Sequence, residues 1–241
     1  MTIRLFEVGG SIRDEMMGIS NPPDRDFCAE APSWDALLEW CNENMQKVFL
    51  VTPEFLTVRG MMPNGTAIDV VMCRADGPSS DGRHPDHVTP GSLFDDLARR
   101  DFTVNAMARE VDPATLEPIG DVIDPFRGLE DLQTRTLRCV GNTTARLNED
   151  FLRILRAARF CITKDMGPSV DLQIELRNDK IWRSMMDTVS LERVREEMQK
   201  MFKHHAVDAI RFLSMRCAHA ALDETLGADS SIWLKPTLEK R

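Results

Sequence analysis

Asp24 and Asp26, two carboxylates separated by one residue, are the side chains of this sequence best suited to chemistry. On a β-strand, residues i and i+2 point to the same face, so these carboxylates would lie side by side. Such a pair can hold a divalent metal ion over a triphosphate. The spacing therefore indicates phosphoryl or nucleotidyl transfer, although Asp-x-Asp alone is also typical of a turn or a helix cap.

A glycine pair upstream, Gly9 and Gly10, would let backbone N–H groups approach a phosphate closely. The helix expected after it would present an N-terminus that favours anions, and Arg13 would add a cation one turn along. Glycine pairs also occur in ordinary turns, so this signal is not specific by itself. No Gly-Lys-Ser/Thr sequence follows, which excludes a P-loop at this position.

A third carboxylate, Asp69, interrupts the apolar segment 67–72. A charge in a half-buried strand is costly unless it is paired or bound to a metal. If this strand neighbours the one with Asp24 and Asp26, three carboxylates would converge. Like charges packed this closely need a cation between them.

Arginines further along the chain could contact a nucleotide. Arg100 lies in a helix predicted over 93–108, and either Arg100 or its neighbour Arg99 is expected to face the site, the other facing solvent or Asp101. Asp150 and Arg153 are i, i+3 neighbours on a later predicted helix, with Arg156 continuing the row. An acceptor beside a donor can recognise the Watson–Crick edge of a base, but the same spacing suits a surface ion-pair row. The arginines would also suit triphosphate oxygens.

The elements that must position these residues form a mixed α/β head. Pro63-Asn64-Gly65 is typical of a hairpin turn, and Ser33 is a plausible helix N-cap. Residues 75–92 are predicted to form a long polar loop, of the kind that is usually functional or mobile. Strands are expected over 3–8, 24–30, 55–62 and 67–73, and helices over 11–17, 34–46, 93–108 and in the short segment 121–132.

The character of the sequence changes near 139–143, after which it is almost wholly helical. The predicted domains are a head over 1–140, a helical neck that selects the nucleobase over 141–205, and a short helical body remnant over 206–241. Helices are expected over 144–162, 169–184, 190–203 and 206–222.

Composition narrows the class of protein. The net charge of −9 argues against nucleic-acid binding by bulk attraction but leaves room for a local basic groove. Six scattered cysteines, without a Cys-x-x-Cys or a Cys/His cluster, indicate buried thiols rather than zinc ligands or disulfides. The sequence has no apolar run long enough to span a membrane and no signal-peptide pattern, so a cytoplasmic protein is expected.

The motifs, taken in order, resemble class II tRNA nucleotidyltransferases (CCA-adding enzymes) and bacterial poly(A) polymerases. The resemblance covers roughly residues 3–203 and implies an α+β fold: a polymerase-β-like nucleotidyltransferase head, with a mixed antiparallel sheet and helices, followed by an all-α neck and a truncated helical body. The matching segments are Val-Gly-Gly-Ser-Ile-Arg-Asp (8–14), Asp-Arg-Asp-Phe (24–27), Asp-Gly-Arg-His-Pro-Asp (81–86), 97–108, 123–132, 149–160 and the neck helix 191–197.

The resemblance also implies roles for the matching residues. Asp24 and Asp26 would bind Mg²⁺ and activate the 3′-hydroxyl of an RNA, with Asp69 as a third catalytic carboxylate. The remaining residues would bind the nucleotide. Among them, Asp150 and Arg153 would select C or A, and Arg156 would lie near the phosphates. The nucleotide-binding set is Gly9, Gly10, Arg13, Arg100, Asp150, Arg153 and Arg156.

The implied activity is template-independent, Mg²⁺-dependent addition of CMP and/or AMP, from CTP and ATP, to an RNA 3′ end, expected to be tRNA. Poly(A)-like addition, C-only or A-only addition, and a non-catalytic nucleotide or RNA binder are the alternatives. Family members usually continue past the neck into helical domains that grip tRNA. A homo-oligomer or a separate RNA-binding chain is therefore the expected source of further RNA contacts.

Overall fold

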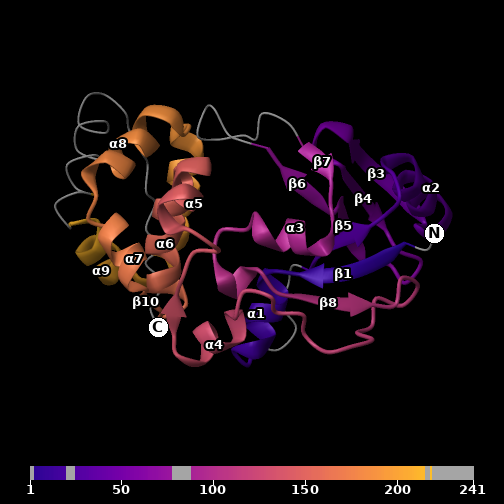
Figure 1. Cartoon of the computed structure of the whole chain (residues 1–241), viewed down its shortest axis with the longest axis horizontal. Helices are drawn as coiled ribbons and strands as arrows, with labels where there is room; N and C mark the ends of the chain where they lie inside the picture. The colour runs from indigo at the N-terminus through magenta and orange to yellow at the C-terminus, as the bar shows by residue number, and fades with distance from the viewer. Residues whose placement is uncertain (1–2, 20–24, 78–87, 215–217, 219–241) are drawn as a thin grey trace. The chain divides into compact units, whose positions relative to one another are not determined.

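The structure, a computed structural model, describes residues 3–19, 25–77, 88–214 and 218. The chain divides into two compact units, with the division between Thr134 and Arg135. The first unit is built on a sheet and the second is mostly helical (Figure 1). The three-part division of the chain at 140/141 and 205/206 stays a prediction. Within the described ranges, no helix is long and apolar enough to cross a membrane.

A six-stranded mixed sheet forms the centre of the first unit, in the order β3–β4–β5–β2–β1–β8. The β2–β5 pair is parallel, and the other neighbouring pairs are antiparallel. This confirms the predicted α+β head with a mixed sheet. The strands are β1 (Arg4–Val8), β2 (Asp26–Glu30), β3 (Lys47–Thr52), β4 (Thr57–Met61), β5 (Ala67–Met72) and β8 (Ala108–Val111).

The two faces of this sheet differ because side chains alternate along each strand. One face forms an apolar core with helix α2 (Trp34–Asn44), whose Leu37 and Cys41 are fully buried. Strand residues that contribute to this core include Leu5, Phe27, Ala29, Val58, Ile68, Val70 and Met72. Asp26 therefore points to the opposite face, since it alternates with Phe27 on β2.

Two local predictions in this unit are confirmed. The Ser33 hydroxyl oxygen accepts a hydrogen bond from the backbone N–H of Ala36 (3.1 Å) and so caps α2. Residues 63–65 turn the chain between β4 and β5, with Gly65 at a φ of +84°.

The remaining short helices are α1 (Gly10–Met16), α3 (Leu93–Ala98), α4 (Gly128–Gln133) and the 3₁₀ turns η1 (Pro53–Phe55) and η2 (Thr103–Asn105).

The helix predicted over 93–108 is wrong beyond Ala98. The Phe102 backbone is extended (φ −124°, ψ 149°), and its N–H donates to the side chain of Asp101 instead of to a helical carbonyl. The chain then continues through η2 into β8, the edge strand beside β1. At the other edge, β3 was not predicted, although Val48 and Val51 are typical of strands.

The predicted polar loop over 75–92 has regular structure at its ends. Strand β6 (Arg74–Asp76) pairs antiparallel with β7 (Val88–Pro90), so these segments form a small two-stranded sheet. Residues 78–87, which include the whole matching motif 81–86, lie outside the described residues.

The second unit contains five helices in its described part, α5 (Thr143–Glu149), α6 (Leu152–Thr163), α7 (Val170–Glu175), α8 (Asp179–Thr188) and α9 (Leu191–Leu213). The helix predicted over 144–162 is interrupted at Asp150, which has an extended backbone. The helix predicted over 169–184 is likewise divided, because Asn178 caps a new helix. His205 (φ −153°, ψ 95°) kinks α9 between the two helices predicted over 190–203 and 206–222.

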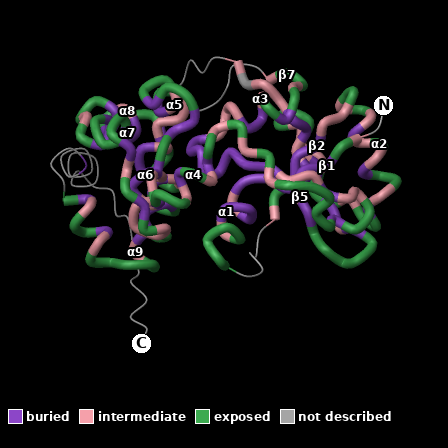
Figure 2. The backbone as a smooth tube through the Cα atoms, turned by 60° about the horizontal axis from the view of Figure 1, so that its bottom comes forward, coloured by how far each residue is buried: buried purple, intermediate pink, exposed green. Residues whose placement is uncertain are grey.

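Packing of α6 against α9 forms the centre of this unit. On α6, Ile154, Leu155 and Ala158 are fully buried. Buried segments recur along the α6 tube in Figure 2. Val194 and Met201 on α9 are fully buried as well. A two-residue parallel ladder between β9 (Thr136–Leu137) and β10 (Gly167–Pro168) completes the unit.

Candidate functional site

A row of in-register residues crosses the face of the sheet opposite α2. Arg59 on β4 pairs with Asp69 on β5, Asp69 pairs with Asp26 on β2, and Asp26 pairs with Val8 on β1. Residues paired in register project from the same face, so the sheet brings the carboxylates of Asp26 and Asp69 to one place. Asp24, the other half of the predicted pair, lies outside the described residues.

The third predicted carboxylate is held by an arginine of the same chain. Arg59 donates from Nε to Oδ1 and from Nη2 to Oδ2 of Asp69, both at 2.5 Å. The side chains of Arg59 and Asp69 are 57% and 32% exposed, so water reaches the pair. The charge in the apolar strand is thus compensated by pairing, one of the two solutions expected from the sequence.

The acidic residues fit a divalent cation in part. Asp26 is exposed, and Asp26 and Asp69 supply carboxylate oxygens, the ligand type that Mg²⁺ prefers. No group of three or more His, Cys, Asp or Glu side chains is placed to hold a metal in the portion of the chain that the structure describes. Among the residues that the structure describes, Asp26 and Asp69 are thus the neighbouring carboxylates in this register, and Asp69 is paired with Arg59.

Cys28 lies two residues beyond Asp26 on the same face but is 1% exposed. A hydrogen bond with Cys73, together with burial, raises the pKa of the Cys28 thiol well above its usual value. A thiol that stays protonated is a poor nucleophile and a poor metal ligand. Cys28 is therefore unsuited to chemistry on this face, and the carboxylates remain the candidates.

The predicted glycine turn directly follows β1. Gly9 has a φ of +79°, and its N–H donates to the carbonyl of Met107 (3.1 Å). A Cβ atom at Gly9 would lie 2.7 Å from Nη1 of Arg100, so this position requires glycine for its backbone and for its space. At Gly10 a Cβ would lie 3.4 Å from Nη2 of Arg13. Both predicted arginines therefore lie against the turn.

Asn105 joins these two arginines. Arg13 Nη1 donates to the side-chain oxygen of Asn105 (2.5 Å), and Arg100 Nη1 donates to its backbone carbonyl (3.3 Å). Asn105 Nδ2 donates in turn to Asp101 (2.9 Å). Guanidinium groups present fixed forks of donors that suit phosphate oxygens. The turn therefore places two such groups beside backbone that can approach an anion closely.

The carboxylate of Asp96 binds Arg100. It is completely buried and accepts from Arg100 Nη2 (3.0 Å) and from Arg99 Nη2 (2.6 Å). Burial tends to raise the pKa of Asp96, but the charges of Arg100 and Arg99 outweigh it and hold the pKa below its ordinary 3.8. Both arginines thus bind Asp96, with side chains that are 24% exposed for Arg99 and 20% for Arg100, and which of them faces the site stays a prediction.

In the second unit, Asp150 and Arg153 have different ion partners. Asp150 accepts from Nη2 of Arg193 (3.1 Å) and from the backbone N–H of Leu152 (3.1 Å). Arg153 donates to the carboxylate of Glu149 (2.8 Å). The two residues are neighbours because the chain leaves α5 at Asp150 and enters α6, rather than because they share one helix.

The third residue of that predicted row, Arg156, lies 3.8 Å from Glu197 on α9. Glu197 is 3% exposed and also pairs with Arg159 and Lys200. Burial would raise the pKa of Glu197, but Arg159 and Arg156 lower it on balance. Glu197, like Asp96 and Asn105, was not identified from the sequence.

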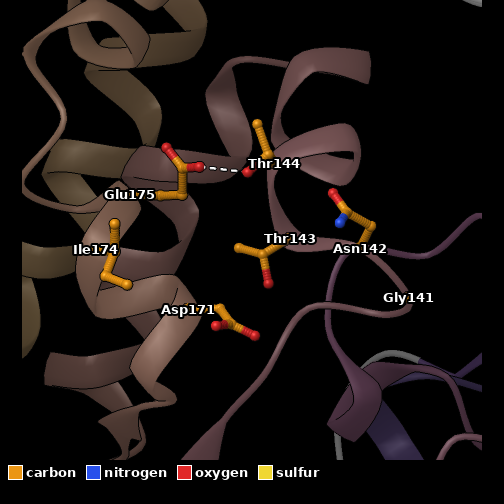
Figure 3. Close-up of a pocket in the computed structure, with 7 residues that line it drawn as sticks. All are labelled: Gly141, Asn142, Thr143, Thr144, Asp171, Ile174 and Glu175. Carbon is orange, nitrogen blue, oxygen red and sulfur yellow. Dashed lines mark hydrogen bonds between the residues drawn. The ribbon is translucent and has the colours of Figure 1, made fainter.

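A polar pocket of about 320 Å³ also lies in this unit, between the start of α5 and helix α7 (Figure 3). The hydroxyl of Thr144 donates to Glu175, whose other oxygen accepts from Asn178 (2.8 Å). Both oxygens of that carboxylate thus have protein partners. The lining residues are Gly141, Asn142, Thr143, Thr144, Asp171, Ile174 and Glu175, none of which was a predicted site residue.

The mixed sheet, with its carboxylates beside a glycine turn, defines a polymerase-β-like nucleotidyltransferase head. Residues 5–138 match the model of the Poly A polymerase head domain. The chain belongs to this family, as its motifs predicted.

The similar proteins are CCA-adding enzymes. The enzyme of Leuconostoc mesenteroides is 34% identical over 200 residues, which cover 81% of this chain and 45% of that protein. The Bacillus stearothermophilus CCA-adding enzyme in complex with CTP has a TM-score of 0.74 at 29% identity, covering 93% of this chain and 51% of that one. The Thermotoga maritima CCA-adding enzyme complexed with tRNA, at 24% identity and a TM-score of 0.72, shows the shared fold, covering 95% of this chain and 50% of that one. This chain spans about half the length of these relatives.

Proposed function

We propose that this chain is a template-independent tRNA nucleotidyltransferase that adds CMP and AMP, from CTP and ATP, to the tRNA 3′ end in the cytoplasm. The observation that supports this most is the meeting of Asp26 and Asp69 on one sheet face, beside a turn that Arg13 and Arg100 flank. The similarity to CCA-adding enzymes supports the same substrates and the same product.

In the proposed reaction, the RNA 3′-hydroxyl attacks the α-phosphate of the nucleotide in line, and the bond to the β-phosphate breaks to release pyrophosphate. Asp24 and Asp26, with Asp69, would hold the Mg²⁺. When bound, that cation lowers the pKa of the attacking hydroxyl and stabilises negative charge on the departing pyrophosphate. Arg13 and Arg100 would hold the triphosphate oxygens against the Gly9–Gly10 backbone.

Selection of the base would rest on Asp150 and Arg153. A carboxylate accepts hydrogen bonds and a guanidinium donates them, so together they match the mixed edge of cytosine or adenine. The ion pair from Arg193 fixes the Asp150 carboxylate, and Glu149 fixes Arg153. Arg156 would lie near the phosphates.

Incubation of the purified chain with labelled CTP or ATP, Mg²⁺ and tRNAs that end before each nucleotide of CCA tests this function. We expect CMP to be added first and a single AMP last. A long run of AMP would instead indicate poly(A) polymerase activity, the second candidate that the description of the head-domain family favours. Addition of only C or only A would indicate a partial enzyme, and nucleotide binding without transfer would indicate a non-catalytic binder.

Replacement of Gly9 by alanine (G9A) is expected to weaken CTP binding by about tenfold or more. The new Cβ would overlap Arg100, and the turn would adopt a positive φ that costs an alanine about 1–2 kcal/mol. Isothermal titration with CTP measures the loss. Gly18→Ala is the matched control, because Gly18 has a φ of +81° but no atom within 4 Å of the added Cβ. Equal CTP affinity in both variants would contradict the proposed contact.

A further inference from the structure

Arg59 belongs to the in-register row, but the proposed reaction leaves its role open. It stands on β4, next to Asp69 and on the same face as Asp26. Both of its hydrogen bonds to Asp69 use the planar fork of the guanidinium, one to each carboxylate oxygen. Asp69 thus has a cation from the chain on its β4 side and the carboxylate of Asp26 on its β2 side.

We propose that Arg59 competes with the divalent metal for Asp69 and thereby sets the metal concentration that the site requires. This inference rests on the metal site of the proposed function. The row assigns Asp69 two alternative cationic partners, the guanidinium of Arg59 and the ion held at Asp26. Arg59 is a positioning residue in this scheme, since it acts on the metal through Asp69.

Exposure makes this exchange feasible. More than half of the Arg59 side chain and about a third of the Asp69 side chain are exposed, at 57% and 32%. Exposed ion pairs contribute little net stability, because each partner regains water when the pair opens. A divalent cation with further oxygen ligands can therefore displace the guanidinium. A buried pair such as Asp96 with Arg100 could not exchange in this way without leaving an uncompensated charge.

Titration of the full chain with Mn²⁺, followed by electron paramagnetic resonance of the free ion, measures the competition without any transfer reaction. Arg59→Ala (R59A) is expected to lower the Mn²⁺ dissociation constant by up to about fivefold, the upper end of the range that exposed pairs span. A gain in affinity is informative because a misfolded variant would lose affinity. Arg4→Ala is the matched control, since Arg4 lies on the same sheet face, is 51% exposed and pairs with Glu30 and Glu110 instead.

Two further backgrounds separate competition for Asp69 from the loss of a nearby positive charge. In an Asp69→Asn background, R59A is expected to leave Mn²⁺ affinity unchanged, because the shared ligand is gone. In an Asp26→Asn background, the Mn²⁺ site that R59A strengthens is expected to be lost. The proposal is overturned if R59A does not tighten binding, if it tightens binding equally in the Asp69→Asn background, if R4A tightens it as much, or if the site survives without Asp26.

The result is independent of the incorporation assay. A chain that binds Mn²⁺ as expected but transfers no nucleotide would refute the proposed function and keep the role of Arg59. A chain that adds CMP and AMP while R59A leaves Mn²⁺ affinity unchanged would support the proposed function and refute the role of Arg59.

Discussion

Loss of nucleotide incorporation, by more than about a thousandfold, is the expected result of replacing Asp24 and Asp26 together with alanine (D24A/D26A). These carboxylates would hold the metal that activates the 3′-hydroxyl and stabilises the leaving group. Without them, the predicted catalytic set is reduced to Asp69, and Arg59 already binds it. Initial rates of CMP incorporation into tRNA that lacks CCA measure the effect.

Stability provides the control for that variant. Asp26 is exposed, so its replacement removes no buried group and should leave the midpoint of thermal unfolding within a few degrees of the unmodified chain. A folded double variant that kept even a tenth of the incorporation rate would refute the assignment of this pair. An unfolded variant would show instead that the segment is structural, and single Asp26→Asn would then replace it in the rate measurement.

Asp96→Asn (D96N) is expected to have the largest effect on stability, a loss of about 3–5 kcal/mol in the free energy of unfolding at pH 7. The carboxylate is completely buried, and its removal leaves Arg99 and Arg100 without their shared counter-ion. Urea denaturation measures the loss. Asp35→Asn, the same chemical change at an exposed site, is the control and should change stability by no more than about 0.5 kcal/mol.

The stability difference between the unmodified chain and D96N should depend on pH in a defined direction. The folded-state pKa of Asp96 lies below its ordinary value of 3.8, because the two arginines outweigh burial. Its contribution is therefore fully present above about pH 4 and is lost as pH falls through the lower, folded-state pKa. The stability gap between the unmodified chain and D96N should narrow only in that acidic range. A gap that narrowed between about pH 5 and 7 would show that Asp96 is not the titrating group.

Features that depend on adjacent residues were predictable from the sequence. The Ser33 cap, the hairpin turn at 63–65 and the glycine turn after β1 each depend on local backbone chemistry, and the structure contains all three. Asp69 was recognised as anomalous because a charge inside an apolar strand must be compensated. Its placement beside Asp26 followed once the two strands were assumed to be neighbours.

Ion partners across the fold were not predictable. Arg59 and Asp69 are ten residues apart and meet because β4 and β5 pair in one particular register. Asp96 has arginines three and four residues further along, a signal that was available, but its complete burial depends on packing against the sheet. The extended backbone at Phe102, which ends the predicted helix, is stabilised by a side chain rather than by sequence periodicity.

The parallel pairing of β2 with β5 has a kinetic consequence. Residues 31–66, including the edge strand β3 and its neighbour β4, must be accommodated before Asp26 and Asp69 can become neighbours. Closure of such a long chain segment loses conformational entropy before the stabilising contacts of the strand pair form. Strands that pair across a long sequence separation therefore form slowly. The hairpin of β4 and β5 is local and can form early, which unites Arg59 with Asp69 first. We therefore expect refolding to form the Arg59–Asp69 pair before β2 pairs with β5, so that metal binding by Asp26 and Asp69, as proposed, would recover only with that later pairing.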